Sequence, residues 1–186
     1  MRKLSVFNNV SLDGFFTDRD GDMSWAHAAG PDPEFDAYVA GNAGSGGTLL
    51  FGRVTYQMMA AFWPSPMAAQ QMPEVARGMN EASKIVFSRT LDRADWQNTR
   101  LIRGDLPAEI RKLKTESGSD MVILGSGSIV AQLAREGLID SYTFVVCPVA
   151  LGAGRPLFEG LTSPLPLRLA ASRSFKNGKA MLSYEC

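Results

Sequence analysis

Three short segments place small or cationic residues directly after an apolar run, where they could bind phosphate. They read VILGSGSI at 122–129, LLFGRVTY at 49–56 and VFSRTL at 86–91. Each apolar run predicts a strand, and in the first two a helix follows the turn. Backbone N–H groups at a helix N-terminus are unsatisfied and lie at the positive end of the helix dipole. The pattern therefore indicates binding of a phosphate-bearing ligand.

The segment around Gly125 departs from two well-known turns. A Rossmann fingerprint requires Gly-x-Gly-x-x-Gly, and the third glycine position holds Val130. A nucleophile elbow requires Gly-x-Ser-x-Gly, but the closing glycine is absent and His27 is the only histidine that could act as a base. Taken alone, the segment could equally be a packing turn between a strand and a helix.

The other two segments add positive charge to the same arrangement. Arg53 and Thr55 fall in the first turn of a predicted helix, where a cation opposes the dipole unless an anion joins it. Arg89 could meet a second phosphate or stack on an adenine, although an arginine after a strand is usually only solvated. Ligands of open α/β sheets bind at the carboxyl ends of the strands, so the three segments should converge there. Two arginines favour a 2′-phosphate, and so NADPH over NADH.

The elements that would position these segments alternate along the chain. Strands are predicted from Leu4 to the Asp13-Gly14 turn and over 47–53, 84–88, 98–103, 121–125 and 141–149. Helices are predicted over 31–41, 53–63, 105–117 and 128–136, with a weaker helical pattern at 65–83.

This alternation predicts a single α/β domain over residues 1–186, with a doubly wound, mostly parallel sheet and helices on both faces. Asn177-Gly178 lies between two strand-like runs and predicts a C-terminal antiparallel hairpin.

The composition excludes several classes of function. With 19 basic and 19 acidic side chains, the chain has no net field to attract nucleic acid. No apolar run approaches the roughly 20 residues of a membrane span, and no signal peptide is present, so a cytoplasmic location is expected. One histidine and two distant cysteines, Cys147 and Cys186, cannot supply the paired ligands of a zinc site, so no metal is expected.

Five segments, taken in order, resemble the dihydrofolate reductase superfamily. They are MSW at 23–25, LLFGRVTY at 49–56, KIVFSRTL at 84–91, MVILGSGSIVAQL at 121–133 and LIDSYTFVVCPVALGAGRPLF at 138–158. The last is the most specific, and it is similar to the branch containing the reductase domain of the bifunctional riboflavin-biosynthesis deaminase-reductase. The resemblance implies a dihydrofolate reductase-like fold and an NADPH-dependent reductase of a small nitrogen heterocycle, such as 5-amino-6-(5-phosphoribosylamino)uracil. No deaminase zinc motif accompanies it.

The resemblance also implies roles for individual residues in holding NADPH. The helix start that contacts the cofactor phosphates matches Gly52, Arg53, Val54 and Thr55. The loop around the 2′-phosphate matches Ser88, Arg89 and Thr90, and the turn under the pyrophosphate matches Gly125, Ser126, Gly127, Ser128 and Ile129. The strand and loop on the nicotinamide side match Val10, Asp13-Gly14 and Trp25.

The proton donor of the folate reductases has no counterpart in this sequence. Those enzymes carry a buried carboxylate five residues after the loop tryptophan, where this chain has Gly30. Asp36 is the candidate donor, although acids at a helix start are also favoured by the dipole alone. Trp25, with Phe16 and Tyr56, could form apolar walls, or these aromatic residues could belong to the core. The missing carboxylate leaves a second hypothesis open, a nucleotide-binding module that keeps the NADPH pocket without chemistry.

A homodimer is also expected. The apolar run YTFVVCPV at 142–149 would be an aggregation hazard near the edge of a sheet unless something covered it. A second copy of the chain would provide that cover.

Overall fold

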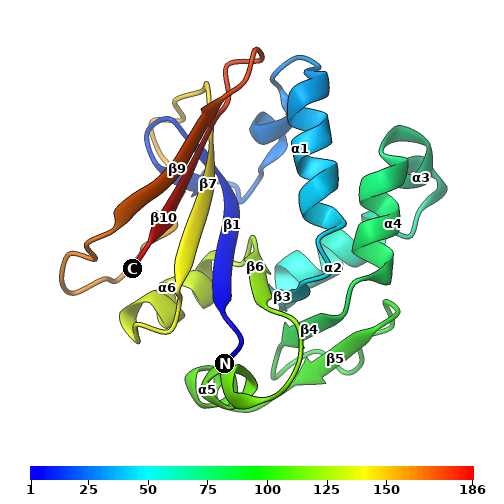
Figure 1. Ribbon diagram of the computed structural model, residues 1–186, viewed down its shortest axis with the longest axis vertical. Helices are drawn as coiled ribbons and strands as arrows, with labels where there is room; N and C mark the ends of the chain where they lie inside the picture. The colour runs from blue at the N-terminus through cyan, green and yellow to red at the C-terminus, as the bar shows by residue number, and fades with distance from the viewer.

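The computed structural model describes residues 1–186 and contains an eight-stranded sheet, shown in Figure 1. The strand order is β5-β4-β3-β6-β1-β7-β10-β9. The first six strands of that order pair in parallel: β5 (Thr99–Ile102), β4 (Lys84–Phe87), β3 (Thr48–Gly52), β6 (Met121–Leu124), β1 (Leu4–Ser11) and β7 (Ser141–Cys147). The hairpin of β9 (Arg168–Ser174) and β10 (Ala180–Glu185) joins them antiparallel through β10. The predicted mostly parallel sheet with a C-terminal antiparallel hairpin is confirmed.

Helices cover both faces of this sheet, as the sequence predicted. They are α1 (Pro33–Ala43), α2 (Arg53–Phe62), α3 (Pro66–Gln71), α4 (Pro73–Glu81), α5 (Leu106–Thr115) and α6 (Gly127–Arg135). A short 3₁₀ helix, η1 (Ser24–His27), and a small ladder of β2 (Phe15–Thr17) with β8 (Arg155–Pro156) lie in the loops. Figure 1 shows α1 and α4 side by side. None of the helices has the length and apolar character that crossing a membrane requires.

The two faces of β1 serve two different cores because successive side chains of a strand point to opposite faces. Leu4 and Val6 are fully buried in the core that α5 and α6 cover. Phe7 instead packs on the face covered by α1, with its ring centroid 6.3 Å from that of Tyr38. The strand therefore separates the two layers of helices.

The structure corrects two expectations about the elements. The helix predicted over 31–41 is α1, which runs on to Ala43, so Gly41 lies inside it. It begins after Asp32, whose carboxylate accepts hydrogen bonds from the N–H groups of Glu34 and Phe35. The expectation that the apolar strand at 142–149 lies near a sheet edge is wrong, because β7 pairs with β1 and β10. The edge strand on that side is β9, which lies beyond β10 and whose residues are all exposed. The homodimer stays a prediction.

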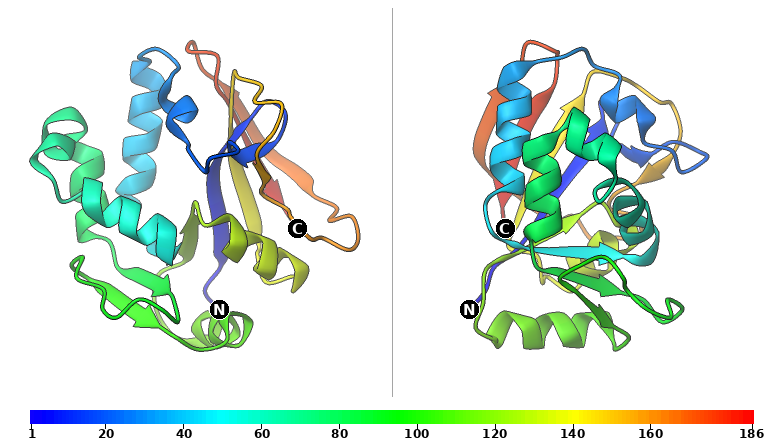
Figure 2. Two further views of the ribbon diagram at one scale, coloured as in Figure 1. Left: turned by 180° about the vertical axis from the view of Figure 1, so that it is seen from behind. Right: turned by 90° about the vertical axis from the view of Figure 1, so that its right-hand side faces the viewer.

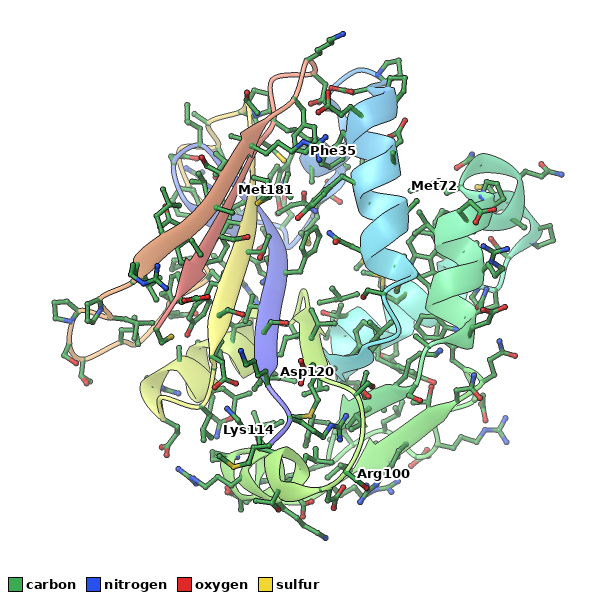
Figure 3. All side chains as sticks on the ribbon, in the orientation of Figure 1. Phe35, Met72, Arg100, Lys114, Asp120 and Met181 are labelled. Carbon is green, nitrogen blue, oxygen red and sulfur yellow. The ribbon has the colours of Figure 1, made fainter.

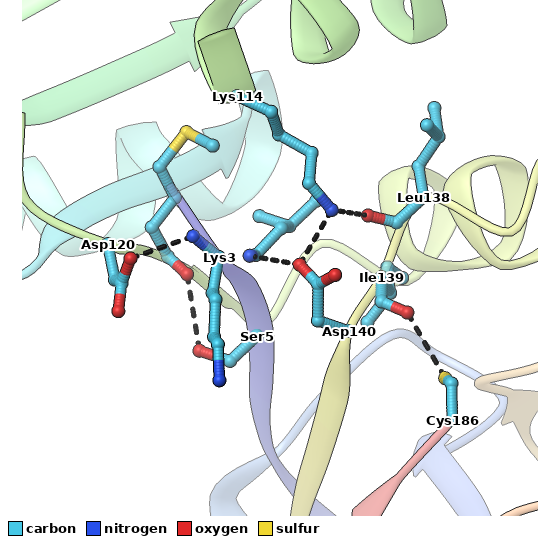
Figure 4. A network of polar contacts seen from close by, with 10 residues as sticks. Lys3, Ser5, Lys114, Asp120, Leu138, Ile139, Asp140 and Cys186 are labelled. Atoms are coloured by element: carbon cyan, nitrogen blue, oxygen red, sulfur yellow. Dashed lines mark hydrogen bonds and ion pairs between the residues drawn. The ribbon is translucent and has the colours of Figure 1, made fainter. Parts of the chain in front are cut away.

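A polar network ties the amino ends of β1 and β7 to α5, as Figure 4 shows. Asp140 Oδ2 accepts hydrogen bonds from Leu4 N at 2.7 Å and from Lys114 Nζ at 2.6 Å. The same ammonium donates to Leu138 O at 3.0 Å. The N-terminus lies beside α5, which is also visible in Figure 2. This network stands at the end of the parallel strands opposite their carboxyl ends.

Candidate functional site

The three segments predicted to bind phosphate follow three neighbouring strands. β4, β3 and β6 are adjacent and parallel, so the turns after Phe87, Gly52 and Leu124 meet at one edge of the sheet (Figure 1). Two of the turns are bonded directly to each other. Gly52 N donates to Ser126 Oγ at 2.8 Å, and Ser126 N donates to Thr55 Oγ1 at 3.1 Å. The starts of α2 and α6 therefore form one unit.

These two helix starts lack the caps that most other helices of the chain have. Side chains of Asp32, Ser65 and Asp105 cap α1, α3 and α5. No side chain caps α2 or α6, and neither helix has an acidic residue in its first turn. Helix α4 is also uncapped, but it carries Glu74 in its first turn. In α6 the N–H of Ile129 already bonds to Ser126 O at 2.9 Å, but the first two N–H groups of α2 and of α6 have no acceptor within their own helices. An anion could satisfy both pairs.

The turn before α6 has a specialised backbone. Gly125 and Ser126 are both in the left-handed region, with φ of 61° and 58°. Asn8, which is 2% exposed, holds this turn: its Oδ1 accepts from Gly125 N at 2.7 Å, and its Nδ2 donates to Gly125 O at 3.5 Å. Sequence reasoning missed Asn8. Its signal was present, because Asn8 continues the buried alternation of Leu4 and Val6, and a buried amide needs a partner.

Phe16 and Tyr56, two of the aromatic residues predicted to line the pocket, lie in different surroundings. Phe16 packs on the turn before α6, and a Cβ at Gly127 would stand 3.0 Å from Phe16 Cδ1. Tyr56 is 4% exposed and its hydroxyl accepts from Trp96 N, so it belongs to the core. Thr55 is buried as well, with its hydroxyl on the backbone of Ser126, which gives it a positioning role.

The predicted cationic residues lie on the rim of the same edge. Arg53 is exposed, and its Nη1 donates only to Gln57 Oε1, at 3.0 Å. Neither Arg53 nor Arg89 has an acidic partner. Ser88 Oγ accepts from Thr90 N and Leu91 N, and so shapes the loop that carries Arg89. The remaining predicted residues of these helix starts are exposed Val54 and Ser128 and buried Ile129.

The predicted nicotinamide side lies around the carboxyl ends of β1 and β7. Trp25, on η1, packs against a small buried cluster of Ala26, Val145 and Cys147. Val10 is partly buried and packs on the opposite face, against the core of α5 and α6.

Asp13 ties the β1–β2 turn to the segment 150–154. Its carboxylate accepts from the Ser11 hydroxyl at 2.7 Å and from the N–H groups of Leu151 at 3.1 Å and Gly152 at 2.7 Å. These hydrogen bonds lower the pKa of Asp13 to about 2, and the bond from the Ser11 hydroxyl has the largest effect. Nearby, Gly154 approaches the backbone so closely that a Cβ would stand 2.0 Å from Thr17 O. Gly152 and Gly154 therefore allow the segment 150–154 to stay in contact with the β1–β2 turn and β2.

No buried carboxylate is free to deliver a proton. Asp36, the candidate donor, is exposed on α1. Asp32 is the one buried acid, and its carboxylate accepts from Glu34 N, Phe35 N and Asn177 N. Burial acts to raise the pKa of Asp32, but these backbone hydrogen bonds outweigh it and hold the pKa below its usual value. No three His, Cys, Asp or Glu side chains come close enough together to hold a metal ion.

Comparison with solved structures shows the fold. A Shewanella sp. PV-4 protein provisionally assigned to riboflavin biosynthesis superposes with a TM-score of 0.74 at 24% identity, over 98% of both chains. A Thermotoga maritima diaminohydroxyphosphoribosylaminopyrimidine deaminase/5-amino-6-(5-phosphoribosylamino)uracil reductase superposes with a TM-score of 0.70 at 14% identity, over 99% of this chain and 56% of that one. The dihydrofolate reductase-like fold implied by the resemblance is confirmed.

Comparison of sequences shows the family. The chain is 28% identical over 183 residues to the uncharacterized protein YyaP of Bacillus subtilis, covering 98% of this chain and 94% of YyaP. It is 29% identical over 177 residues to the uncharacterized protein YwjB of the same organism, covering 94% of this chain and 92% of YwjB. Residues 2–181 match the family model of the RibD C-terminal domain, and the chain belongs to that family.

Proposed function

We propose that this chain is an NADPH-dependent reductase of a small nitrogen heterocycle. The observation that carries the proposal is the junction of two uncapped helix N-termini, those of α2 and α6, beside two arginines without acidic partners. Free N–H groups and guanidinium groups together suit the phosphates of a dinucleotide. Arg53, Val54, Gly127 and Ser128 would hold the pyrophosphate, and Arg53 with Arg89 would hold the 2′-phosphate. When bound, NADPH supplies the hydride.

The remaining residues of the site would position the phosphate-binding turn and shield the reacting groups from water. Asn8 fixes the Gly125 turn, so the N–H groups at the start of α6 are aimed before any ligand arrives. Phe16 and Trp25 would exclude water from the reacting groups. The activity in the name of the Thermotoga relative suggests a pyrimidine-type ring as the substrate. A location in the cytoplasm is part of the proposal, because NADPH is an intracellular reductant and both cysteines are free thiols.

Replacing Arg53 tests the phosphate role. In Arg53→Ala, NADPH binding should weaken by about 1.5–3 kcal/mol, the typical contribution of a charged hydrogen bond. NADH, which has no 2′-phosphate, should lose much less. Titration of purified protein with each cofactor, followed by cofactor fluorescence, measures both affinities.

Arg77→Ala is the matched control for that experiment. Arg77 is an exposed arginine on α4, paired with Glu74 and outside the three turns, so its loss should leave both affinities unchanged. Equal weakening of NADPH and NADH in Arg53→Ala would refute a contact with the 2′-phosphate.

One observation favours a second candidate, a module that binds the nucleotide without catalysing a reaction. The only buried acid, Asp32, is fully engaged with backbone donors, which leaves no free buried carboxylate as a proton donor. The two candidates separate in an assay of NADPH absorbance with a panel of pyrimidines and pteridines. Tight NADPH binding without oxidation of NADPH by any ring would favour the module.

A further inference from the structure

One buried cation of this chain lacks an oxygen acceptor. Arg2, Lys84 and Lys179 are the three cationic residues classed as buried. Arg2 donates to Thr48 Oγ1 at 2.8 Å, and Lys84 Nζ donates to three backbone carbonyls at 2.6–3.0 Å. Lys179 is 5% exposed, and its ammonium contacts only the face of the Phe35 ring, 4.1 Å from the centroid. Every fully enclosed side-chain nitrogen or oxygen of the chain has a hydrogen-bond partner, so the Lys179 nitrogen still reaches solvent. The ammonium is therefore free to donate to an oxygen that a ligand brings.

Lys179 belongs to a group of side chains on the face of the sheet that α1 covers. It precedes β10, and the pairing of Ala180 with Val146 places it beside Cys147 of β7. Cys147 Sγ lies 3.9 Å from Asn9 Oδ1, and Trp25 and Phe35 pack against the small buried cluster that contains this cysteine. We call Asn9, Trp25, Phe35, Cys147 and Lys179 the lysine cluster. Phe35, labelled in Figure 3, lies between α1 and the C-terminal hairpin, with its ring 5.1 Å from that of Phe175.

The lysine cluster is close to the proposed coenzyme site. β6, which carries the Gly125 turn, and β10 are separated by β1 and β7. Three strand spacings correspond to about 14–15 Å. Asn8 binds the Gly125 turn, and the next residue, Asn9, points to the other face and joins the cluster. A ligand that extends from the turns after β3 and β6, past the carboxyl end of β1, would meet Lys179.

The charges around Lys179 favour an electron-rich ligand atom. The titratable groups that face it are Cys147 on β7, Asp36 on α1 and His27 on η1. Burial raises the pKa of the Cys147 thiol, so this neighbour is neutral. Asp36 is exposed and makes no hydrogen bond with the lysine. The cluster therefore offers an ammonium with no carboxylate bonded to it.

We propose that Lys179 binds an oxygen of the substrate, a ring carbonyl or an enolate, and so selects oxo-heterocycles over rings that bind as cations. The inference rests on the proposed function, since it assigns the substrate end of that site. A cationic amidine-type ring would need a free buried carboxylate, and Asp32 is already engaged by backbone donors. An oxo ring instead supplies the acceptor that Lys179 lacks. The ring would lie against Trp25 and Phe35, whose aromatic faces suit a flat heterocycle.

Binding of two small probes tests this assignment. Barbiturate carries enolate oxygen at neutral pH, whereas 2,4-diaminopyrimidine presents an amidine edge. Calorimetric titrations would use the wild type, Lys179→Met and Lys179→Arg, each with and without NADPH. The methionine keeps the apolar stem over Phe35 and removes the charge. Lys179→Met should weaken barbiturate binding by about tenfold or more, the loss expected for one charged hydrogen bond, and Lys179→Arg should retain most of it.

Two results would overturn the assignment: failure of the wild type to bind barbiturate, or barbiturate binding that is the same in wild type and Lys179→Met. Equal or tighter binding of diaminopyrimidine to the wild type would also overturn it. Unchanged NADPH affinity in the variant shows that it is folded. If NADPH does not bind the wild type while barbiturate binding depends on Lys179, the proposed reductase function fails and the lysine site stands.

A measurement on the wild type keeps the test valid if Lys179→Met does not fold. Burial lowers the pKa of Lys179 from 10.5. Barbiturate affinity should therefore begin to fall below pH 10.5, as the ammonium loses its proton. A flat profile up to that pH would also overturn the assignment.

Discussion

Gly125 occupies both a backbone conformation and a space that disfavour a side chain. Its φ is +61°, and a Cβ there would stand 2.9 Å from Thr55 Cγ2. An alanine therefore meets left-handed strain of about 1–2 kcal/mol. It also overpacks the junction of α2 and α6, at a further cost of about 1–3 kcal/mol. Gly125→Ala should lower the free energy of unfolding by the sum of both effects and weaken NADPH binding, as urea denaturation and cofactor titration would measure.

Gly137→Ala provides the matched control at the other end of α6. Gly137 also has φ +61°, but no heavy atom lies within 4 Å of its Cβ position. Gly137→Ala should lower the free energy of unfolding by the backbone strain alone and leave NADPH binding unchanged. Equal destabilisation by the two substitutions would mean that the contact with Thr55 does not constrain the turn.

At the scale of elements, Asp13 joins two loops that lie far apart in the sequence. Because hydrogen bonds depress the pKa of Asp13 to about 2 from 3.8, its ionised form stabilises the fold. This stabilisation is fully present above pH 3.8 and is lost as the pH falls through about 2. Asp13→Asn should lower the melting temperature at neutral pH, and its difference from the wild type should shrink over that acidic window. Thermal melts of both proteins across the pH range measure this.

Asp92→Asn makes the same chemical change at an aspartate whose side chain forms no hydrogen bond or ion pair. Its melting curves should follow the wild type at every pH. A difference between Asp13→Asn and wild type that stays constant down to pH 2 would show that the carboxylate charge does not stabilise the loops.

The sequence predicted elements better than contacts between elements. Glycine after an apolar run located the starts of α2 and α6, and Asn177-Gly178 located the hairpin, because these signals are local. The bond from Asn177 N to Asp32 Oδ2 joins residues 145 positions apart. It depends on which strands become neighbours, and local periodicity does not encode that order. The same holds for Lys179, whose position beside Cys147 follows from the pairing of β7 with β10.

At the scale of the whole molecule, the proposed coenzyme site and a polar network between elements lie at opposite ends of the parallel strands. The turns proposed to bind the coenzyme lie at the carboxyl ends of β3, β4 and β6. The network of Lys114 and Asp140 lies at the amino ends of β1 and β7 and joins them to α5. Loss of this network should therefore destabilise the chain without changing the site.

Lys114→Met tests that separation. The Lys114 and Asp140 side chains are 15% and 38% exposed, so solvent screens the pair only partly. Removing the ammonium should cost about 1–2 kcal/mol of the free energy of unfolding, toward the lower end for charged hydrogen bonds. Arg111→Met is the control on the same helix, because its pair with Glu136 is 54% and 45% exposed and should contribute under about 1 kcal/mol. Urea denaturation measures both losses, and cofactor titration should give wild-type NADPH affinity for both variants. Equal destabilisation would show that the Lys114–Asp140 pair contributes no more than an exposed pair. Weaker NADPH binding by Lys114→Met alone would show that the two ends of the sheet are coupled.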